Sequence, residues 1–85
     1  MTVRLLYFGG VQEAVGCSAE MLELAPGAHT IGALRERLAT RGGKWSTLGV
    51  DRRLRFAVNR VLVSGSDTAV RDGDEVAVFP PVTGG

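Results

Sequence analysis

The sequence predicts an α+β domain in which one main helix packs across a mixed sheet of four to five strands. Three observations carry this prediction. The chain has only 85 residues, strand-like runs occupy both of its ends, and one stretch with helical spacing lies between them. A chain of this length forms one domain and needs a compact core without long loops. We therefore expect two strands, one helix and then three strands.

The first third of the chain predicts two strands separated by a short helix. Residues 2–8 are rich in β-forming side chains, and two glycines follow them directly. Val11 and Val15 stand four residues apart, which indicates one or two helical turns that end at Gly16. Residues 19–25 place their leucines on one face and a glutamate on the other, as a half-buried strand does. We expect the two strands to pair antiparallel.

The clearest helical pattern follows this hairpin. Thr30 is a candidate N-cap, because its hydroxyl can accept a hydrogen bond from an exposed backbone N–H. Residues 35–37 are expected largely on the solvent side, and the apolar positions recur at i, i+3 and i+7: Ile31, Leu34 and Leu38. Gly42 and Gly43 are expected to close the helix in left-handed conformations. Residues 44–50 are expected to form a loop or short turn that packs onto the core.

The last third predicts three strands, at residues 54–58, 61–63 and 75–79. Asn59-Arg60 makes the first turn, residues 64–68 form a polar loop, and Gly73 tolerates the positive φ that the final turn needs. One helix lying across such a sheet is the β-grasp, or ubiquitin-like, architecture. Because the long crossover lies between the first and the last strand, we expect these two strands to be adjacent and parallel at the sheet centre.

Composition excludes several functional classes. A net charge of +1 gives no reason to expect nucleic-acid binding. Cys17 and His29 are the single cysteine and histidine, so neither a disulfide framework nor a metal site is expected. The sequence offers no convergent set of acid, base and nucleophile, so we expect neither catalysis by the chain alone nor a bound cofactor. Without a signal peptide or a membrane-length apolar run, a cytoplasmic location is expected.

The C-terminal stretch FPPVTGG is the most informative part of the sequence. We divide the chain into a domain of residues 1–79 and an extended tail of residues 80–85. Pro80 and Pro81 lack an N–H and cannot extend the sheet ladder, and two prolines in a row favour a stiff, extended exit. The β-branched Val82 and Thr83 stay extended, and the six tail residues reach roughly 20 Å.

The final two residues, Gly84 and Gly85, have no Cβ and can pass through a slot too narrow for other residues. A tail of this shape is suited to insertion into the active site of another protein. An ATP-using partner could convert the Gly85 carboxylate into an acyl-adenylate. Sulfide equivalents could then displace AMP and leave a thiocarboxylate, which is a soft nucleophile able to deliver sulfur.

The whole chain resembles the small subunit of molybdopterin synthase, the MoaD family. The resemblance is most specific in FAVNRVLV and in VRDGDEVAVFPPVTGG, and HTIGALRERLA and VRLLYFGGVQEAVG fit less specific regions. It implies a ubiquitin-like sulfur carrier for molybdenum cofactor biosynthesis. In this family an E1-like adenylyltransferase activates the terminal glycine, and a sulfurtransferase or cysteine desulfurase system converts it to a thiocarboxylate. The tail then enters the large synthase subunit of a heterotetramer, where sulfur passes to precursor Z (cyclic pyranopterin monophosphate) to form the dithiolene.

The resemblance also assigns roles to residues. It makes Gly85 the acyl site and Gly84 its slim neighbour. The tail residues that line the partner channel in the family match Phe79, Pro80, Pro81, Val82 and Thr83. Leu62 and Phe79 match apolar positions on the partner-facing sheet surface, with core burial as the alternative for Leu62. The chain departs from the family at Gln12, where many relatives carry arginine, which affects partner specificity.

Two other functions stay open on the sequence alone. One is a sulfur carrier for thiamine thiazole synthesis, which shares the β-grasp and the terminal Gly-Gly, although such carriers are usually shorter and lack FPPVTGG. The other is a ubiquitin-like modifier, whose glycine tail forms isopeptide bonds to lysines.

Overall fold

The computed structural model describes residues 1–27 and 29–81. In these residues, seven strands form two sheets, and four helical segments lie between the strands along the chain. The strands are β1 (Thr2–Tyr7), β2 (Ala19–Glu23), β3 (His29–Thr30), β4 (Arg55–Val58), β5 (Val61–Val63), β6 (Ala69–Val70) and β7 (Glu75–Phe79). The helices are α1 (Gly9–Val15), α2 (Ile31–Ala39), the 3₁₀ helix η1 (Gly43–Ser46) and α3 (Thr47–Val50).

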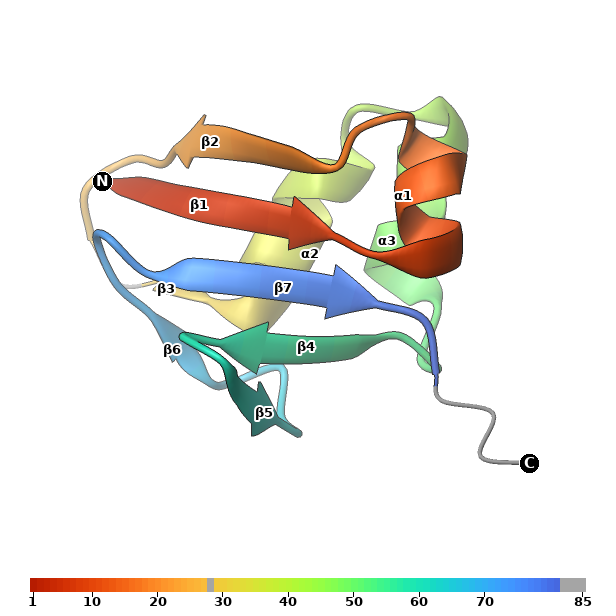
Figure 1. Cartoon of the computed structure of the whole chain (residues 1–85). Coiled ribbons are helices and arrows are strands. Elements are labelled where there is room, and N and C mark those ends of the chain that lie inside the picture. The colour runs from red at the N-terminus through yellow and green to blue at the C-terminus, as the bar shows by residue number, and fades with distance from the viewer. Residues whose placement is uncertain (28, 82–85) are drawn as a thin grey trace.

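The main sheet has five strands in the order β2-β1-β7-β4-β5. β1 and β7 run parallel, whereas β2 pairs with β1, and β4 with both β7 and β5, in antiparallel register. The first and last strands therefore lie together at the sheet centre, which confirms the predicted topology. Figure 1 shows this sheet in front, with α2 behind it and α1 and α3 at the end where β1 and β7 finish.

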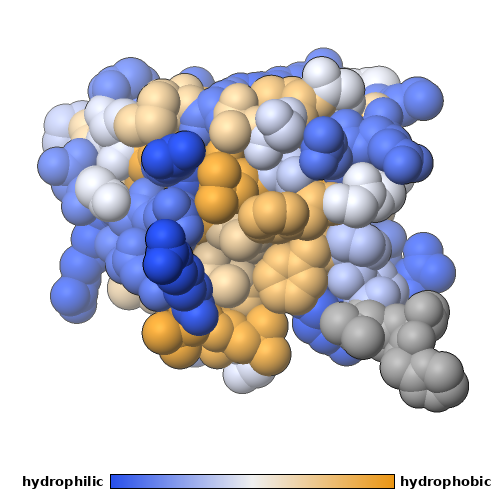
Figure 2. Space-filling view, viewed as in Figure 1, coloured by the Kyte–Doolittle hydropathy of each residue, from blue (hydrophilic) through white to orange (hydrophobic). Residues whose placement is uncertain are grey.

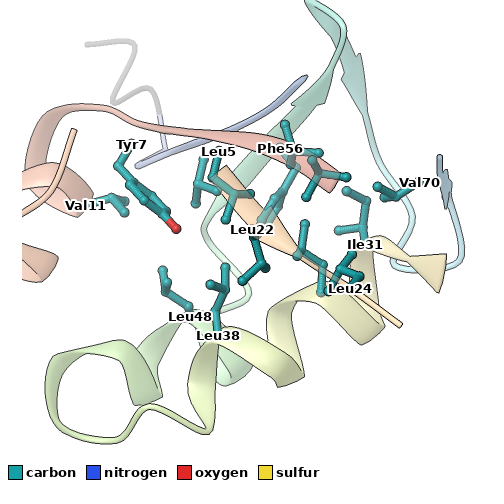
Figure 3. Packing of buried hydrophobic residues seen from close by; sticks show 14 residues of the cluster. Leu5, Tyr7, Val11, Leu22, Leu24, Ile31, Leu38, Leu48, Phe56 and Val70 are labelled. Carbon is teal, nitrogen blue, oxygen red and sulfur yellow. The ribbon is translucent and has the colours of Figure 1, made fainter. Parts of the chain in front are cut away.

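Alternating burial along the central strands gives the sheet an inner and an outer face. In β1 the side chains of Val3, Leu5 and Tyr7 are buried, and in β7 those of Val76 and Val78. Leucines and an isoleucine from the helices meet them to form one core, at Ile31, Leu34, Leu38 and Leu48. Figure 3 shows these two groups of side chains facing each other. Each fully buried aliphatic side chain contributes about 1.5–3 kcal/mol.

The turns confirm most of the local predictions. Gly16 ends α1 with φ +72°, and the Thr30 hydroxyl accepts a hydrogen bond from the Ala33 N–H at 3.1 Å. Asn59 and Arg60 both have positive φ, as a tight hairpin turn needs. The Asn59 side chain also accepts from the Glu75 N–H and donates to Asp74, so it joins the β4–β5 turn to the start of β7.

Four local predictions were incomplete or wrong. α2 ends at Ala39, before the two glycines expected to close it. Residues 44–50, expected as a loop or short turn packed on the core, lie within two short helical segments, η1 and α3, and Leu48 is buried there as expected. The two-stranded sheet of β3 and β6 was not predicted, because two-residue strands carry no alternation. Arg35, expected in solvent, is half-buried, and its guanidinium donates to the carbonyls of Leu48 and Asp51 at 2.7 and 2.6 Å.

None of the helices in the described part of the chain is long and apolar enough to cross a membrane.

A polar network ties the segment after α2 to the sheet. Two guanidinium nitrogens of Arg41 donate to the Glu20 carboxylate at 2.8 and 2.7 Å, and the hydroxyl of buried Tyr7 donates to it at 2.9 Å. The Arg41 guanidinium also lies 4.3 Å from the ring centre of Trp45, which packs edge-on against Tyr7. The hydrogen bonds from Arg41 are the main cause that lowers the pKa of Glu20.

We expect this network to make the stability of the fold depend on pH. Because the folded-state pKa of Glu20 lies below its unfolded value, the stabilisation is present above the unfolded pKa of about 4.3 and is lost as pH falls through the folded pKa. The Glu20→Gln variant should therefore lose less free energy of unfolding than the wild type between neutral and acid pH. Urea denaturation at a series of pH values measures this. Glu13→Gln, an exposed position on α1, is the control, and identical profiles for Glu20→Gln and the wild type would contradict the prediction.

Candidate functional site

The candidate site begins where β7 ends. Phe79 is the last residue of this central strand, and Pro80 and Pro81, which follow it, are half-buried. Neither proline has an N–H to donate, so the ladder stops there. Of the residues predicted to act, Val82, Thr83, Gly84 and Gly85 lie outside the described residues. The prediction that Gly85 carries the chemistry therefore stays a prediction.

The junction between β1 and α1 packs against Pro80. We call Pro80 and Pro81 the stem. The Phe8 N–H donates to the carbonyl of Val78 at 3.0 Å, which holds the junction against the end of β7. Gly9 has φ +55°, and a Cβ at this position would lie 3.2 Å from Cγ of Pro80. A glycine is needed here both for the left-handed backbone and for the close approach. Gly9, which the sequence marked only as part of a strand breaker, thus supports Pro80.

A hollow of about 400 Å³ lies beside the stem, between α1 and α3. Its apolar lining includes Val11, Ala14, Val15, Leu48, Leu54, Pro80 and Pro81. Asp51 and Arg53 stand at its rim and form an ion pair at 3.1 Å. The hydrogen bonds from Arg53 lower the pKa of Asp51. The stem is therefore bordered by apolar surface, with charge only at the edge.

The outer face of the main sheet carries an apolar row that crosses all five strands. Strand register places the members of this row side by side, in the order Ala19, Leu6, Ala77, Ala57 and Leu62. Leu62 at its end is 64% exposed, so the alternative of core burial for this residue is wrong. Figure 2 shows hydrophobic surface over the middle of this face and down to β5. Alanines in the centre let another protein approach the sheet closely.

The apolar row continues towards the stem. Phe79 lies on the same face of β7 as Ala77, two residues further along, and Phe8 at the end of β1 is 48% exposed. Arg55 is the cross-strand neighbour of Phe79. We call the apolar row together with Phe8 and Phe79 the outer apolar face. It places two sequence-predicted residues, Leu62 and Phe79, on one surface that leads to Pro80. Gln12 lies exposed on α1.

Potential metal ligands are scattered over the described part of the chain. Within residues 1–27 and 29–81, no three His, Cys, Asp or Glu side chains come close enough together to hold a metal ion. Cys17 is half-buried, and its thiol lies 3.2 Å from the carbonyl of Ala19. What the site offers is an apolar surface and a rigid exit for the tail.

A family model described as the ThiS family matches residues 5–85 of this sequence. The chain belongs to the ThiS family. It is 45% identical over 83 residues to the molybdopterin synthase sulfur carrier subunit of Escherichia coli, which covers 98% of this chain and 99% of that protein. The resemblance to the small-subunit family is thereby confirmed.

Solved structures of other proteins share the fold of this chain. The fold matches the small chain in a protein-protein complex of subunits 1 and 2 of the molybdopterin-converting factor from Helicobacter pylori, with a TM-score of 0.67, 27% identity and full coverage of both chains. It also matches small archaeal modifier protein 1 of Haloferax volcanii with a TM-score of 0.78, covering 95% of this chain and 98% of that one. At 22% identity, the second likeness shows the fold alone. The predicted β-grasp is confirmed.

The contact between Gly9 and Pro80 can be tested with two matched glycine variants of this ThiS-family chain. Gly9→Ala and Gly16→Ala both place a side chain at positive φ, which costs about 1–2 kcal/mol, but a Cβ at Gly16 has no atom within 4 Å. We expect both variants to lower the free energy of unfolding. Only Gly9→Ala should also shift the NMR signals of Phe79 and Pro80 and weaken binding to a protein that captures the tail. Equal shifts at Pro80 in both variants would contradict a local role for Gly9.

Proposed function

We propose that this chain is the sulfur-carrier small subunit of molybdopterin synthase and acts in molybdenum cofactor biosynthesis. The observation that carries the proposal is the outer apolar face, which leads without interruption to the proline stem that precedes Gly84 and Gly85. The name and the near-complete coverage of the Escherichia coli relative support it. In this function the folded body binds a partner and the C-terminal glycine reacts.

The reaction starts with a carboxylate, which is a poor electrophile because its charge repels nucleophiles. An E1-like adenylyltransferase activates this group: the Gly85 carboxylate attacks the α-phosphorus of ATP, pyrophosphate leaves, and an acyl-adenylate forms. A sulfurtransferase or cysteine desulfurase system then supplies a persulfide, whose terminal sulfur attacks the acyl carbon and displaces AMP to form an acyl disulfide. A thiol cleaves the S–S bond of this acyl disulfide, which leaves the thiocarboxylate on Gly85 and a disulfide between the thiol and the donor cysteine. ATP is consumed by the partner, and the chain itself binds no cofactor. These steps place the protein in the cytoplasm, where ATP is available.

The loaded carrier delivers its sulfur inside the large subunit of the synthase. The outer apolar face docks on that subunit, and the complex of subunits 1 and 2 known from Helicobacter pylori supports this choice of partner. Phe79 to Thr83 then line the channel, and Gly84 and Gly85 pass through its narrowest part. The acceptor is precursor Z, and each dithiolene requires two sulfur atoms. Two small subunits in a heterotetramer with two large ones meet this need.

The thiocarboxylate provides the direct test of this function. Incubation with the adenylating partner, ATP and a sulfur source should increase the intact mass by the difference between one sulfur and one oxygen atom. The variant that lacks Gly85 should fold normally, because the core that the structure describes is built from residues between Val3 and Val78, but it should give neither this species nor product. Absence of the heavier species in the wild type would contradict the carrier function. Isopeptide adducts on lysines would favour a protein modifier.

The prolines of the stem should strengthen partner binding because they restrict the free tail. Replacing both Pro80 and Pro81 by glycine lets the unbound tail sample more conformations, which should weaken binding to the large subunit by about 1–2 kcal/mol. Isothermal titration calorimetry measures the affinity. Pro26→Gly, in the exposed loop after β2, is the control and should bind like the wild type. An unchanged affinity of the double variant would show that the stem is not preorganised.

A further inference from the structure

A second hollow, of about 370 Å³, lies at the β5 edge of the main sheet, where the loop after β5 meets α2. Three arginines line it, and its remaining walls are apolar side chains and a short polar loop: Ile31, Leu54, Phe56, Leu62, Val63 and residues 64–66. The arginines are Arg35, Arg52 and Arg55. No aspartate or glutamate is among the described residues that line it. We call this feature the arginine hollow.

Of the arginines that the structure describes, three outside the hollow lie within ion-pair distance of a carboxylate: Arg41, Arg53 and Arg60. Arg41 pairs with Glu20 at 2.7 Å, and Arg53 pairs with Asp51. Within the described part of the chain, Arg52 and Arg55 have no carboxylate within ion-pair distance; Arg55 donates only to the backbone carbonyl of Arg53. Both side chains are on exposed residues. The hollow therefore concentrates positive charge on a chain whose net charge is only +1.

Arg35 forms the fixed back wall of the hollow. Its Nε and Nη2 donate to the carbonyls of Leu48 and Asp51, and its guanidinium lies 5.0 Å from the ring centre of Phe56. These contacts hold the side chain in one position and use two of its five guanidinium N–H groups. Arg35 therefore contributes positive charge at a fixed position. The exposed guanidinium groups of Arg52 and Arg55 can donate hydrogen bonds to a ligand at the rim of the hollow.

The arginine hollow is continuous with the outer apolar face. Leu62 is the end member of the apolar row and also lines the hollow. Arg55 is the cross-strand neighbour of Phe79, from which the stem departs. A protein that covers the outer apolar face and takes up the tail would therefore extend over Arg55 and into the hollow.

We infer that the arginine hollow binds a segment of the large synthase subunit that carries aspartate or glutamate next to an apolar residue. This inference rests on the proposed function. The exposed rim arginines match carboxylates, and the floor of Ile31, Leu54 and Phe56 matches an apolar side chain. A protein segment satisfies both features at once, whereas a free phosphate would satisfy only the rim. Charge pairs at an interface rim accelerate association and select the partner.

The test compares two double charge reversals with the same net charge. Arg52→Glu/Arg55→Glu removes the rim of the hollow, and Arg37→Glu/Arg71→Glu reverses two other exposed arginines away from both the hollow and the outer apolar face. Binding of the large subunit from the same genome is measured by surface plasmon resonance at low and at physiological salt. We expect about tenfold weaker binding for the first variant at low salt, mainly through slower association. The difference should shrink at higher salt, and the second variant should change far less.

The outcomes separate this inference from the proposed function. If the wild type binds the large subunit and the two reversals weaken binding equally, the arginine hollow is not a contact and the inference alone fails. If the wild type does not bind at all, the proposed function fails and takes the inference with it. Inorganic phosphate is titrated into the wild type and the Arg52→Glu/Arg55→Glu variant and followed by NMR. Saturable binding seen only in the wild type would assign the hollow to a small anion and overturn the inference. Circular dichroism and thermal unfolding confirm that both variants are folded.

Discussion

The parallel pairing of β1 with β7 is the constraint on which the rest of the structure depends. The register runs from Arg4 opposite Glu75 to Tyr7 opposite Val78, so the first and the last strand of the described chain are joined over residues 4–7 of β1. β4 occupies the other edge of β7, and each backbone edge of the last strand is therefore paired. A strand held on both sides opens only when the domain opens. The stem consequently begins from the most strongly held part of the sheet, and its direction is set by the fold.

The same pairing explains why the two faces of the sheet differ. Side chains alternate across a strand, so Val76 and Val78 are buried under the helices while Ala77 and Phe79 point the other way. Helices cover only the inner face (Figure 1). The outer face would be expected to carry polar side chains if it faced water alone, yet a row of alanines and leucines crosses it. Contiguous apolar surface on a small domain usually marks an interaction site. The strand that exposes this surface is also the strand that delivers the tail.

Sequence reasoning recovered the elements whose signal is local. Alternation in β7, the Thr30 cap and the turn at Gly73 each depend on residues within a few positions, and each was predicted. Features that depend on distant residues were missed. Nothing near Arg35 in the sequence indicates that its guanidinium would reach two carbonyls around α3, and the β3–β6 pair exists only because the fold brings two short segments together. For the candidate site, the two prolines were singled out from the sequence, and Leu62 and Phe79 came from the family resemblance. The close approach of Pro80 to Gly9, where a Cβ would lie 3.2 Å from the proline ring, was missed.

In the proposed function, a reactive end built from glycine has a consequence for specificity. Gly84 and Gly85 have no side chains, so a partner can recognise little in them beyond their small size and the charge of the Gly85 carboxylate. Discrimination between partners therefore has to reside in the folded body, where side chains differ. The outer apolar face supplies contact area but little selectivity, because any apolar surface of the right shape fits it. Charges at its border are what can repel a wrong partner, and Arg52 and Arg55 stand at that border, one of them directly beside the strand that ends in the stem. Because Arg55 and Phe79 are cross-strand partners, the sheet holds one of these charges directly beside the residue that precedes Pro80.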